Sequence, residues 1–368
     1  MRLKSMKNEY LGRWVLTTSG VVEGHLVVSA DQVEEICYGK APAESSKALV
    51  LPGLVNAHTH VADSVAFPAP KGCVEELVAP PDGYKHRILR DTPAAKKRDA
   101  MCSAIETMLR TGTTTFIDFR EEGIEGIQTL VDSIPSPSPR AVILGRPLSS
   151  DIDNSEIDRL LERSDGIGMS SVRDWPLDFL GRLSRRAKAK KKLFAIHASE
   201  SVREDMDAIL GLAPDFVVHM TKASEEEILA CAQRKIPIVV CPRANAFYGL
   251  APNIPMMLRL GATVALGTDN GMISEPNMLD ELKAAFKVGK RMGDITPIEA
   301  ASLATFSGRK VLNQMGKILT KASPGDDLAV VRVKGEDPLL ELVTSTRSQD
   351  VMAVVKGGKI WRAESWKR

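Results

Sequence analysis

The hydrophobic positions in the middle of the chain form short runs that are rich in β-branched residues and bounded by glycine, proline or charged residues. They lie at 51–57, 112–118, 140–145, 165–170, 193–198, 215–220, 236–241 and 262–269. Stretches with helical spacing separate many of them, at 95–110, 155–163, 174–191, 225–233 and 255–260. Strands that alternate with helices indicate βαβ units, and eight such units can close into a (β/α)8 barrel. We therefore predict an α/β fold with a TIM barrel over residues 51–319.

The two ends of the chain carry a different pattern, in which apolar and polar residues alternate. Residues 10–50 show it, and residues 316–362 show it again, with turn signals between the alternating segments. This spacing is typical of antiparallel strands with one buried face. We predict that residues 1–50 and 320–368 together form one small β-sandwich domain. His25 has no partner ligand on its own strand and is predicted to be a structural or surface histidine.

Four of the six histidines stand where a predicted strand gives way to a loop. His58 and His60 end the first strand, His197 the fifth and His219 the sixth, while Asp269 ends the eighth. In a parallel barrel the loops after the strands build the active site. Alternate strand residues point the same way, so both histidines of the H-x-H pair can enter the barrel mouth. Any one of these side chains could be an ordinary buried residue, but independent accidents rarely converge on one face.

Imidazole nitrogens and carboxylate oxygens are ligands that zinc and ferrous iron accept, and a catalytic site keeps a position open for water. The pattern therefore predicts a divalent metal ion at the barrel mouth. Its predicted ligands are His58, His60, His197 and Asp269.

Composition limits the partners. The chain has 368 residues, is 43% hydrophobic and carries a formal charge of +2, which gives no field strong enough to indicate nucleic acid or an anionic membrane. The basic run at 185–192 is interpreted as the solvated face of a helix. We expect a small-molecule substrate, no nucleic acid and no membrane. Barrels of this size often associate symmetrically, so a homo-oligomer is one alternative.

Cysteine use and the first residues indicate the compartment. The five cysteines form no C-x-x-C pair and no even set, which favours a reducing environment. The N-terminal residues are charged and lack the apolar core of a signal peptide, and no apolar run approaches the length of a spanning helix. We predict a cytoplasmic protein.

Five motifs follow one another along the chain: PGLVNAHTH, HASE, the lone histidine of FVVHM, CPRANAFYG and GTDN. In this order they resemble the amidohydrolase superfamily, and more narrowly its branch with cytosine deaminase, S-adenosylhomocysteine deaminase and the triazine hydrolases. The resemblance covers nearly the whole chain, including the split domain at its ends. Two-metal members use a carboxylated lysine on the fourth strand, but DGIGMSSVRDW contains none. The resemblance therefore implies one metal ion, for which we expect zinc, with iron as the alternative.

The resemblance also implies catalytic roles. Glu200, three residues after His197, is the expected shuttle that moves a proton from water to a substrate ring nitrogen. Without this neighbour it would be interpreted as an acid favoured by a helix N-terminus. His219 is expected to hydrogen-bond the attacking hydroxide, and Asp269 to contact the metal and accept a proton. A metal-bound hydroxide can attack an electron-poor ring carbon, so the predicted reaction is hydrolytic release of ammonia.

Substrate selection is less explicit in the sequence. The loop after the first strand, 61–90, is long and departs from the pattern expected of cytosine deaminase. Such loops are often lids or pocket walls, in which Lys85 or His86 could contact substrate; otherwise the two are surface residues. Arg120 and Arg146 could each bind a carboxylate or phosphate, or form a structural ion pair. Asn245 could orient substrate or fix a turn. The remaining candidate on this face is Asp63.

We therefore predict a mononuclear metal-dependent aminohydrolase that acts on a purine, pterin or pyrimidine derivative. The same site could instead displace chloride or an alkylamine, or cleave a cyclic amide. A non-catalytic binding scaffold would predict loss of the ligands or of Glu200, and all are present. The H-x-E and P-C-x-x-C signature of the nucleoside and single-strand DNA deaminases is missing, so any deaminase activity belongs to a different fold.

Overall fold

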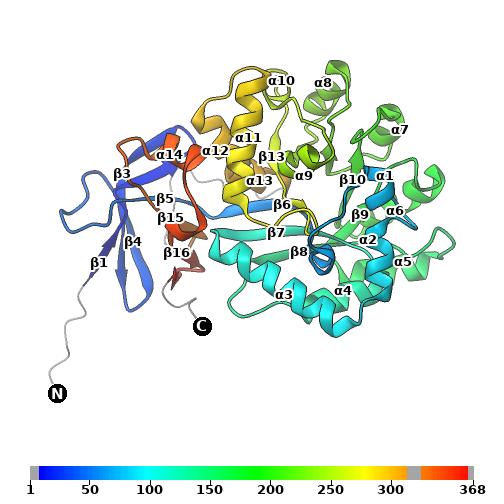
Figure 1. Cartoon of the computed structure of the whole chain (residues 1–368), viewed down its shortest axis with the longest axis horizontal. Helices are drawn as coiled ribbons and strands as arrows, with labels where there is room; N and C mark the ends of the chain where they lie inside the picture. Colours follow the sequence, from blue (N-terminus) through cyan, green and yellow to red (C-terminus); the bar gives the residue numbers. More distant parts are fainter. Residues whose placement is uncertain (1–7, 313–324, 364–368) are drawn as a thin grey trace.

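A TIM-like barrel of parallel strands forms the larger part of the molecule. In a computed structural model, residues 8–312 and 325–363 are described, and Figure 1 shows the helices arranged around a central sheet. The strands follow one another around this sheet in chain order. They are β6 (Leu54–His60), β7 (Thr113–Arg120), β8 (Arg140–Gly145), β9 (Gly166–Met169), β10 (Leu193–Ala198), β11 (Phe216–His219), β12 (Ile238–Val240), β13 (Val264–Leu266) and β14 (Asp269–Asn270).

The ring of parallel strands is completed by a strand that is interrupted at Gly267 and Thr268. β13 pairs with β12, whereas β14 pairs with β6. Asn56 of β6 fixes the interruption, because its Nδ2 donates to Thr268 Oγ1 at 2.7 Å and its Oδ1 accepts from the Thr268 amide at 2.9 Å. A Cβ at Gly267 would lie 2.6 Å from the Cβ of His58, so glycine allows this close approach. The interruption places Asp269 directly opposite Thr59 of β6.

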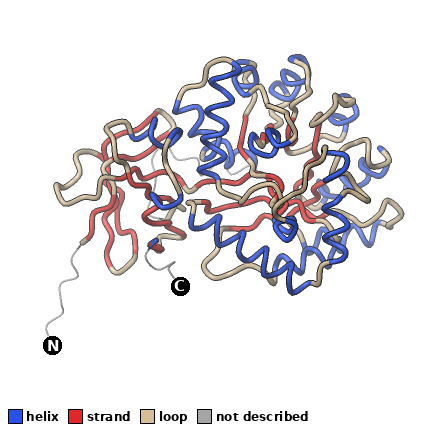
Figure 2. Tube along the Cα trace, viewed as in Figure 1, coloured by secondary structure: helices blue, strands red, loops and turns tan. Residues whose placement is uncertain are grey.

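Helices cover the outside of these strands (Figure 2). The predicted helical stretches are confirmed by α3 (Ala94–Arg110), α5 (Asn154–Arg163), α6 (Leu177–Ala189), α8 (Glu225–Gln233) and α10 (Ile254–Arg259). The others around the barrel are α4 (Gly123–Val131), α7 (Met206–Gly211), α9 (Pro242–Phe247), α11 (Met278–Met292), α12 (Pro297–Ala304) and α13 (Phe306–Val311). Capping boxes begin α5 at Asp153 and α8 at Ser224, where a side chain accepts from the backbone amide three residues later.

The two chain ends form a second sheet of eight strands. They are β1 (Glu9–Leu11), β2 (Trp14–Thr17), β3 (Gly20–Ser29), β4 (Gln32–Tyr38), β5 (Ala48–Pro52), β15 (Leu328–Arg332), β16 (Val351–Lys356) and β17 (Lys359–Arg362). β3 pairs with β4 as well as with β2, so the strands from β2 to β17 close into a seven-stranded barrel, and β1 adds to β3. α14 (Pro338–Thr344) and the 3-10 turn η3 (Ser348–Asp350) lie between β15 and β16.

The predicted β-sandwich is therefore corrected to a small closed barrel. Alternating apolar residues identify a buried face but do not say whether the sheet closes, and closure is what removes the free edges. His25 of β3 is buried, and its ring lies edge-on to that of Tyr10, with centroids 5.7 Å apart. The predicted boundary between residues 319 and 320 lies outside the described residues.

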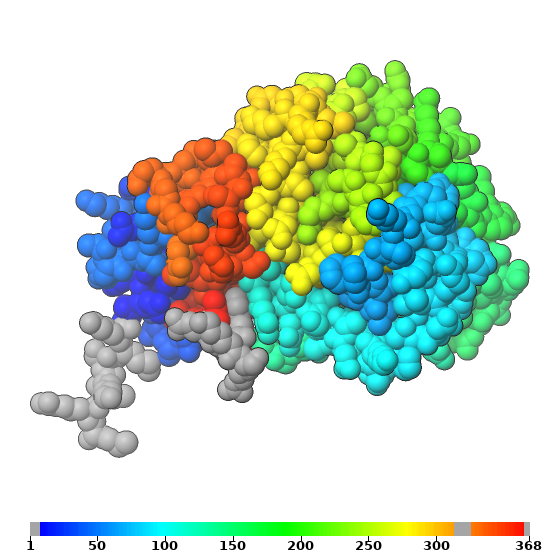
Figure 3. Space-filling view, in the orientation of Figure 1, coloured from blue at the N-terminus to red at the C-terminus, as the bar shows by residue number. Residues whose placement is uncertain are grey.

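The long segment after β6 covers part of the barrel surface. It contains the 3-10 turn η1 (Val61–Ala66), α1 (Val74–Leu77) and α2 (Tyr84–Asp91). Figure 3 shows this segment beside the residues near 270, and the Ala69 amide donates to the Met272 carbonyl at 2.8 Å. Among the helices of the described residues, none combines the length and the hydrophobicity needed to cross a membrane.

Candidate active site

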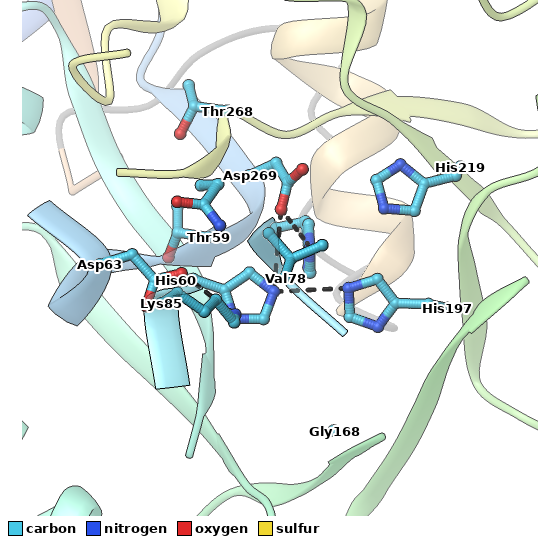
Figure 4. Close-up of polar contacts among 12 residues, drawn as sticks. Thr59, His60, Asp63, Val78, Lys85, Gly168, His197, His219, Thr268 and Asp269 are labelled. Atoms are coloured by element: carbon cyan, nitrogen blue, oxygen red, sulfur yellow. Dashed lines mark hydrogen bonds and ion pairs between the residues drawn. The ribbon is translucent and has the colours of Figure 1, made fainter. Parts of the chain in front are cut away.

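The end of β6 carries two of the candidate ligands, His58 and His60. Thr59 lies between them, and its Oγ1 donates to Asp118 Oδ1 of β7 at 3.0 Å. The same carboxylate oxygen accepts from the backbone amide of Val61 at 2.7 Å. Asp118 thus fixes the chain on both sides of His60, whose imidazole points toward His197 and Asp269 (Figure 4).

Four side chains from separate strands converge at the barrel mouth. One ligand atom from each lies within 4.8 Å of all the others: His58, His197, His219 and Asp269. His60 Nε2 lies 3.4 Å from His197 Nε2 and 3.7 Å from Asp269 Oδ1. Two ligands of one tetrahedral zinc ion, each about 2.0–2.1 Å from the metal, lie roughly 3.3–3.4 Å apart. The spacing of these donors fits a single divalent cation.

The surroundings of His58 support this fit. Within the described residues, neither ring nitrogen of this buried side chain has a hydrogen-bond partner, although Nε2 lies 3.2 Å from Asp269 Oδ1. A buried polar atom without a partner costs free energy unless something satisfies it. A cation between His58 and Asp269 would satisfy His58 Nε2. The chemistry of the donor set is that of a zinc or iron site.

The outer nitrogens of two histidines are occupied by acceptors. His197 Nδ1 lies 2.7 Å from the carbonyl oxygen of Met169, and His60 Nδ1 lies 2.8 Å from Glu121 Oε1. A carbonyl oxygen only accepts, so Nδ1 of His197 carries the hydrogen and Nε2 keeps its lone pair. This lone pair faces the cluster, as metal ligation requires.

The site holds His58, His60 and His197 neutral and Asp269 ionised. Burial lowers the pKa of His58, lowers that of His60 to about 3 with help from Lys85, and lowers that of His197 well below its usual value. Burial acts to raise the pKa of Asp269, but His58 and the other histidines hold it below its ordinary value. Neutral imidazole and ionised carboxylate are the forms that bind metal.

Glu200 and His219 lie together beside the cluster. Glu200 Oε2 is 3.6 Å from His219 Nε2, and the Glu200 side chain is 16% exposed. Burial raises the pKa of Glu200 to about 7, against the opposing effect of His219. His219 Nδ1 lies 3.2 Å from Asn245 Nδ2; in this orientation of the amide, the hydrogen of His219 resides on Nε2 and faces the carboxylate. A carboxyl group with a pKa near 7 beside an imidazole suits proton transfer.

The backbone is strained at two of these positions. His219 has a φ of 76° and Asp269 a φ of 58°, both in the left-handed region that side chains rarely adopt. Each such residue costs of order 1–3 kcal/mol, and strain of this kind gathers at functional sites. The turns aim both side chains into the mouth at the ends of β11 and β14.

A cavity of about 240 Å³ opens over the cluster. It is smaller than the roughly 300–1,000 Å³ cavities that hold drug-sized ligands, so it suits a small molecule. Its lining includes His60, Lys85, Arg146, His197, Glu200, His219, Tyr248 and Asp269.

Only some of the residues predicted to contact substrate line this cavity. Lys85 and Arg146 line this cavity. His86 lines an adjoining cavity of about 450 Å³, which Arg146 also lines, and its Nε2 lies 3.1 Å from the Val78 carbonyl. Asn245 is buried against His219. Asp63 and Arg120 are buried beside the cluster in a network of charged side chains.

That network surrounds Glu121, which directly follows β7. Lys85 Nζ lies 2.8 Å from Glu121 Oε1 and 3.1 Å from Asp63 Oδ2. Arg120 Nη2 lies 3.0 Å from Glu121 Oε2, and Arg146 Nη1 lies 3.5 Å from Oε1. Burial acts to raise the pKa of Glu121, but Lys85 and the other cations hold it well below its usual range.

Sequence reasoning missed Glu121 and several cavity-lining residues. The latter include Glu75, Ser170, Arg173, Tyr248 and Asn270. The signal for Glu121 was its position at the carboxyl end of a predicted strand, next to a candidate arginine. Tyr248 and Asn270 follow CPRANAF and GTD directly, so the motifs point to them too.

Comparison with known proteins places this site in context. The model of the Amidohydrolase family matches residues 49–361. A protein named putative aminohydrolase from Methanothermobacter thermautotrophicus is 30% identical over 362 residues, covering 91% of this chain and 94% of that protein. A 5-methylthioadenosine/S-adenosylhomocysteine deaminase from Moorella thermoacetica is 28% identical over 372 residues, covering 86% and 82%.

The fold has close counterparts among solved structures. A crystal structure of an adenosine deaminase from Xanthomonas campestris with bound zinc superimposes with a TM-score of 0.78. The alignment covers 96% of this chain and 92% of that one, at 19% sequence identity. At this identity the likeness concerns the fold.

Proposed function

The chain belongs to the amidohydrolase family, and we propose that it is a mononuclear metal-dependent deaminase that releases ammonia from an amino-substituted nitrogen heterocycle. One observation carries the proposal. The donors of His58, His197, His219 and Asp269 lie within 4.8 Å of one another, and His60 Nε2 lies 3.4 Å from His197 Nε2. These donors adjoin a carboxyl group, Glu200, that burial brings to a pKa of about 7. A small cavity lies over both.

We assign the metal to His58, His60, His197 and Asp269, and expect it to be zinc. When bound, such an ion acts as a Lewis acid and makes water a stronger nucleophile near neutral pH. One observation supports a separate role for His219, although it lies in the same cluster of donors. Its Nε2 faces Glu200, 3.6 Å from Oε2.

Glu200 moves the proton in this proposal. Its ionised carboxylate accepts a proton from the attacking water and, as the neutral acid, gives it to the ring nitrogen beside the carbon under attack. A pKa of about 7 makes both forms accessible near neutral pH. The second proton of the water passes to Asp269 and from there to the exocyclic amino group, which leaves as ammonia, while the water oxygen becomes the ring carbonyl.

His219 stabilises the oxygen that gains charge during attack. His219 lines the cavity, where its Nε2 lies 3.6 Å from Glu200 Oε2, while Asn245 contacts its other nitrogen and fixes the ring orientation. A hydrogen-bond donor that is oriented before the reaction costs no reorganisation when charge develops.

The substrate class is open to direct measurement. Ammonia release by zinc-loaded protein should be followed across aminopurines, aminopterins, aminopyrimidines and aminotriazines, together with 5-methylthioadenosine and S-adenosylhomocysteine, with Glu200→Gln as the blank. Release that the mutant lacks would identify the ring. Metal-loaded protein that releases no ammonia from any of these, but releases chloride or opens a cyclic amide, would contradict the deaminase proposal.

A further inference from the structure

We propose that Glu121 is a positioning residue for the metal site, holding His60 in the tautomer that ligates, and that Lys85 locks Glu121 in place from the segment after β6. The inference rests on the metal site proposed above. It does not depend on which heterocycle reacts, because its tests need no substrate.

The first step concerns the hydrogen of His60. Its Nδ1 lies 2.8 Å from Glu121 Oε1. Three cations surround the carboxylate, with Lys85 at 2.8 Å, Arg120 at 3.0 Å and Arg146 at 3.5 Å. Such surroundings keep it ionised, so it can only accept. Two lone pairs at 2.8 Å would repel one another, and Nδ1 must therefore carry the hydrogen.

The second step concerns the other nitrogen of His60. With the hydrogen on Nδ1, Nε2 presents its lone pair toward His197 Nε2 and Asp269 Oδ1, 3.4 and 3.7 Å away (Figure 4). An ionised acceptor on the outer nitrogen also makes imidazole a stronger donor to a metal. Removing such a partner typically costs about 10–100-fold in metal affinity.

The third step explains why Lys85 is buried. Its Nζ lies 3.4 Å from His60 Nδ1 and could donate to it in the opposite tautomer, which would put the hydrogen on Nε2 and abolish ligation. Instead, Glu121 Oε1 is shared by the lysine and the histidine at equal distances of 2.8 Å. Asp63 Oδ2 holds the lysine from the other side at 3.1 Å. The segment that carries Lys85 is therefore coupled to the metal site.

The test compares two neighbouring carboxylates. Glu121→Gln keeps the shape of the side chain but loses its charge, and only one of its terminal atoms can still accept. Glu122→Gln is the matched control, because Glu122 pairs with Lys97 at 2.5 Å outside the cluster. Zinc affinity is measured by competition with a chromophoric chelator, and the Tm of each metal-free protein is recorded.

We expect Glu121→Gln to weaken zinc binding about 10-fold or more, and Glu122→Gln to stay within about 2-fold of wild type. The two metal-free variants should have similar Tm values, so that a loss of stability does not explain the difference in zinc affinity. Equal zinc affinities of Glu121→Gln and wild type would overturn the proposal. A wild type that binds no zinc would overturn it together with the proposed function.

A second measurement does not depend on whether the variant folds. In zinc-loaded wild type labelled with 15N-histidine, NMR distinguishes a protonated Nδ1 from a protonated Nε2, and a His60→Asn sample identifies the His60 signals. We expect His60 to carry its hydrogen on Nδ1. A hydrogen on Nε2 of His60 would overturn the assignment even if Glu121→Gln binds zinc weakly.

Discussion

The site has two sides, one at His60 and one at His197 and His219, and they differ in the group that contacts Nδ1 of each histidine. Behind His60 stands an ionised carboxylate held by three cationic side chains, all of them buried. Behind His197 is a backbone carbonyl, and behind His219 is the neutral amide of Asn245. The charged side lies under the segment after β6, and the neutral side adjoins Glu200.

Burial acts on both sides but with opposite consequences. It lowers the pKa of His60 to about 3, far from neutrality, so this proposed ligand stays neutral over the working range. It raises the pKa of Glu200 to about 7, where a small change in surroundings transfers a proton. Burial therefore keeps the proposed ligand His60 from titrating near neutral pH and allows the proposed proton shuttle Glu200 to titrate there.

Loss of a direct ligand tests the metal assignment and should have the largest effect. His197→Ala should lose bound zinc and turnover together, because it removes one donor and enlarges the cavity. Zinc content after desalting and ammonia release are the measurements. His25→Gln is the matched control, since it removes another buried histidine, in the end barrel, and should retain both. Stoichiometric zinc in His197→Ala would contradict the ligand set.

Loss of the proposed proton shuttle should reduce turnover without weakening zinc binding. Glu200→Gln should keep wild-type zinc affinity and lose about 10²–10⁴-fold in kcat, the usual contribution of a general acid and base. Glu75→Gln removes a carboxylate from the same cavity wall and should change kcat far less. A Glu200→Gln enzyme with normal turnover would remove the shuttle from the mechanism.

The pH dependence follows from the same group. Because Glu200 must be ionised to accept the proton from water, kcat of the wild type should fall as the pH is lowered through its pKa. Burial raises that pKa to about 7, and a bound cation would move it downward. The acid limb should therefore lie at or below neutral pH and should vanish in the residual activity of Glu200→Gln. If the acid limb lay at the same pH in the wild type and in Glu200→Gln, it would report the titration of another group.

Much of the parallel barrel could be predicted from the sequence, because strands buried on both faces are continuous apolar runs. The fifth run, 193–198, coincides with β10. The first run, 51–57, was misleading, since Gly53 divides it between β5 of the end barrel and β6 of the parallel barrel. A Cβ at Gly53 would lie 2.2 Å from Thr114 Oγ1, a packing constraint that no pattern of hydrophobicity reveals.

The candidate site divides in the same way. His58, His60 and His197 could be proposed from strand ends, because the ends of parallel strands meet on one face. The ion-pair partner of an arginine or lysine could not be proposed from the sequence, since ion pairs depend on distances between residues that are far apart in the chain. Arg120 was equally consistent with a substrate contact and with a structural pair, and its guanidinium lies 3.0 Å from Glu121.

The smallest expected effect belongs to the neutral partner of His219. Asn245→Ala should leave zinc affinity unchanged and lower kcat roughly tenfold, because the imidazole keeps its place but loses the contact that fixes its tautomer. Asn253→Ala is the matched control: its side chain accepts from the Met256 amide at 3.2 Å and begins α10. If Asn245→Ala weakened zinc binding as much as Glu121→Gln does, His219 would be a ligand, and the division into a metal-holding side and a proton-moving side would fail.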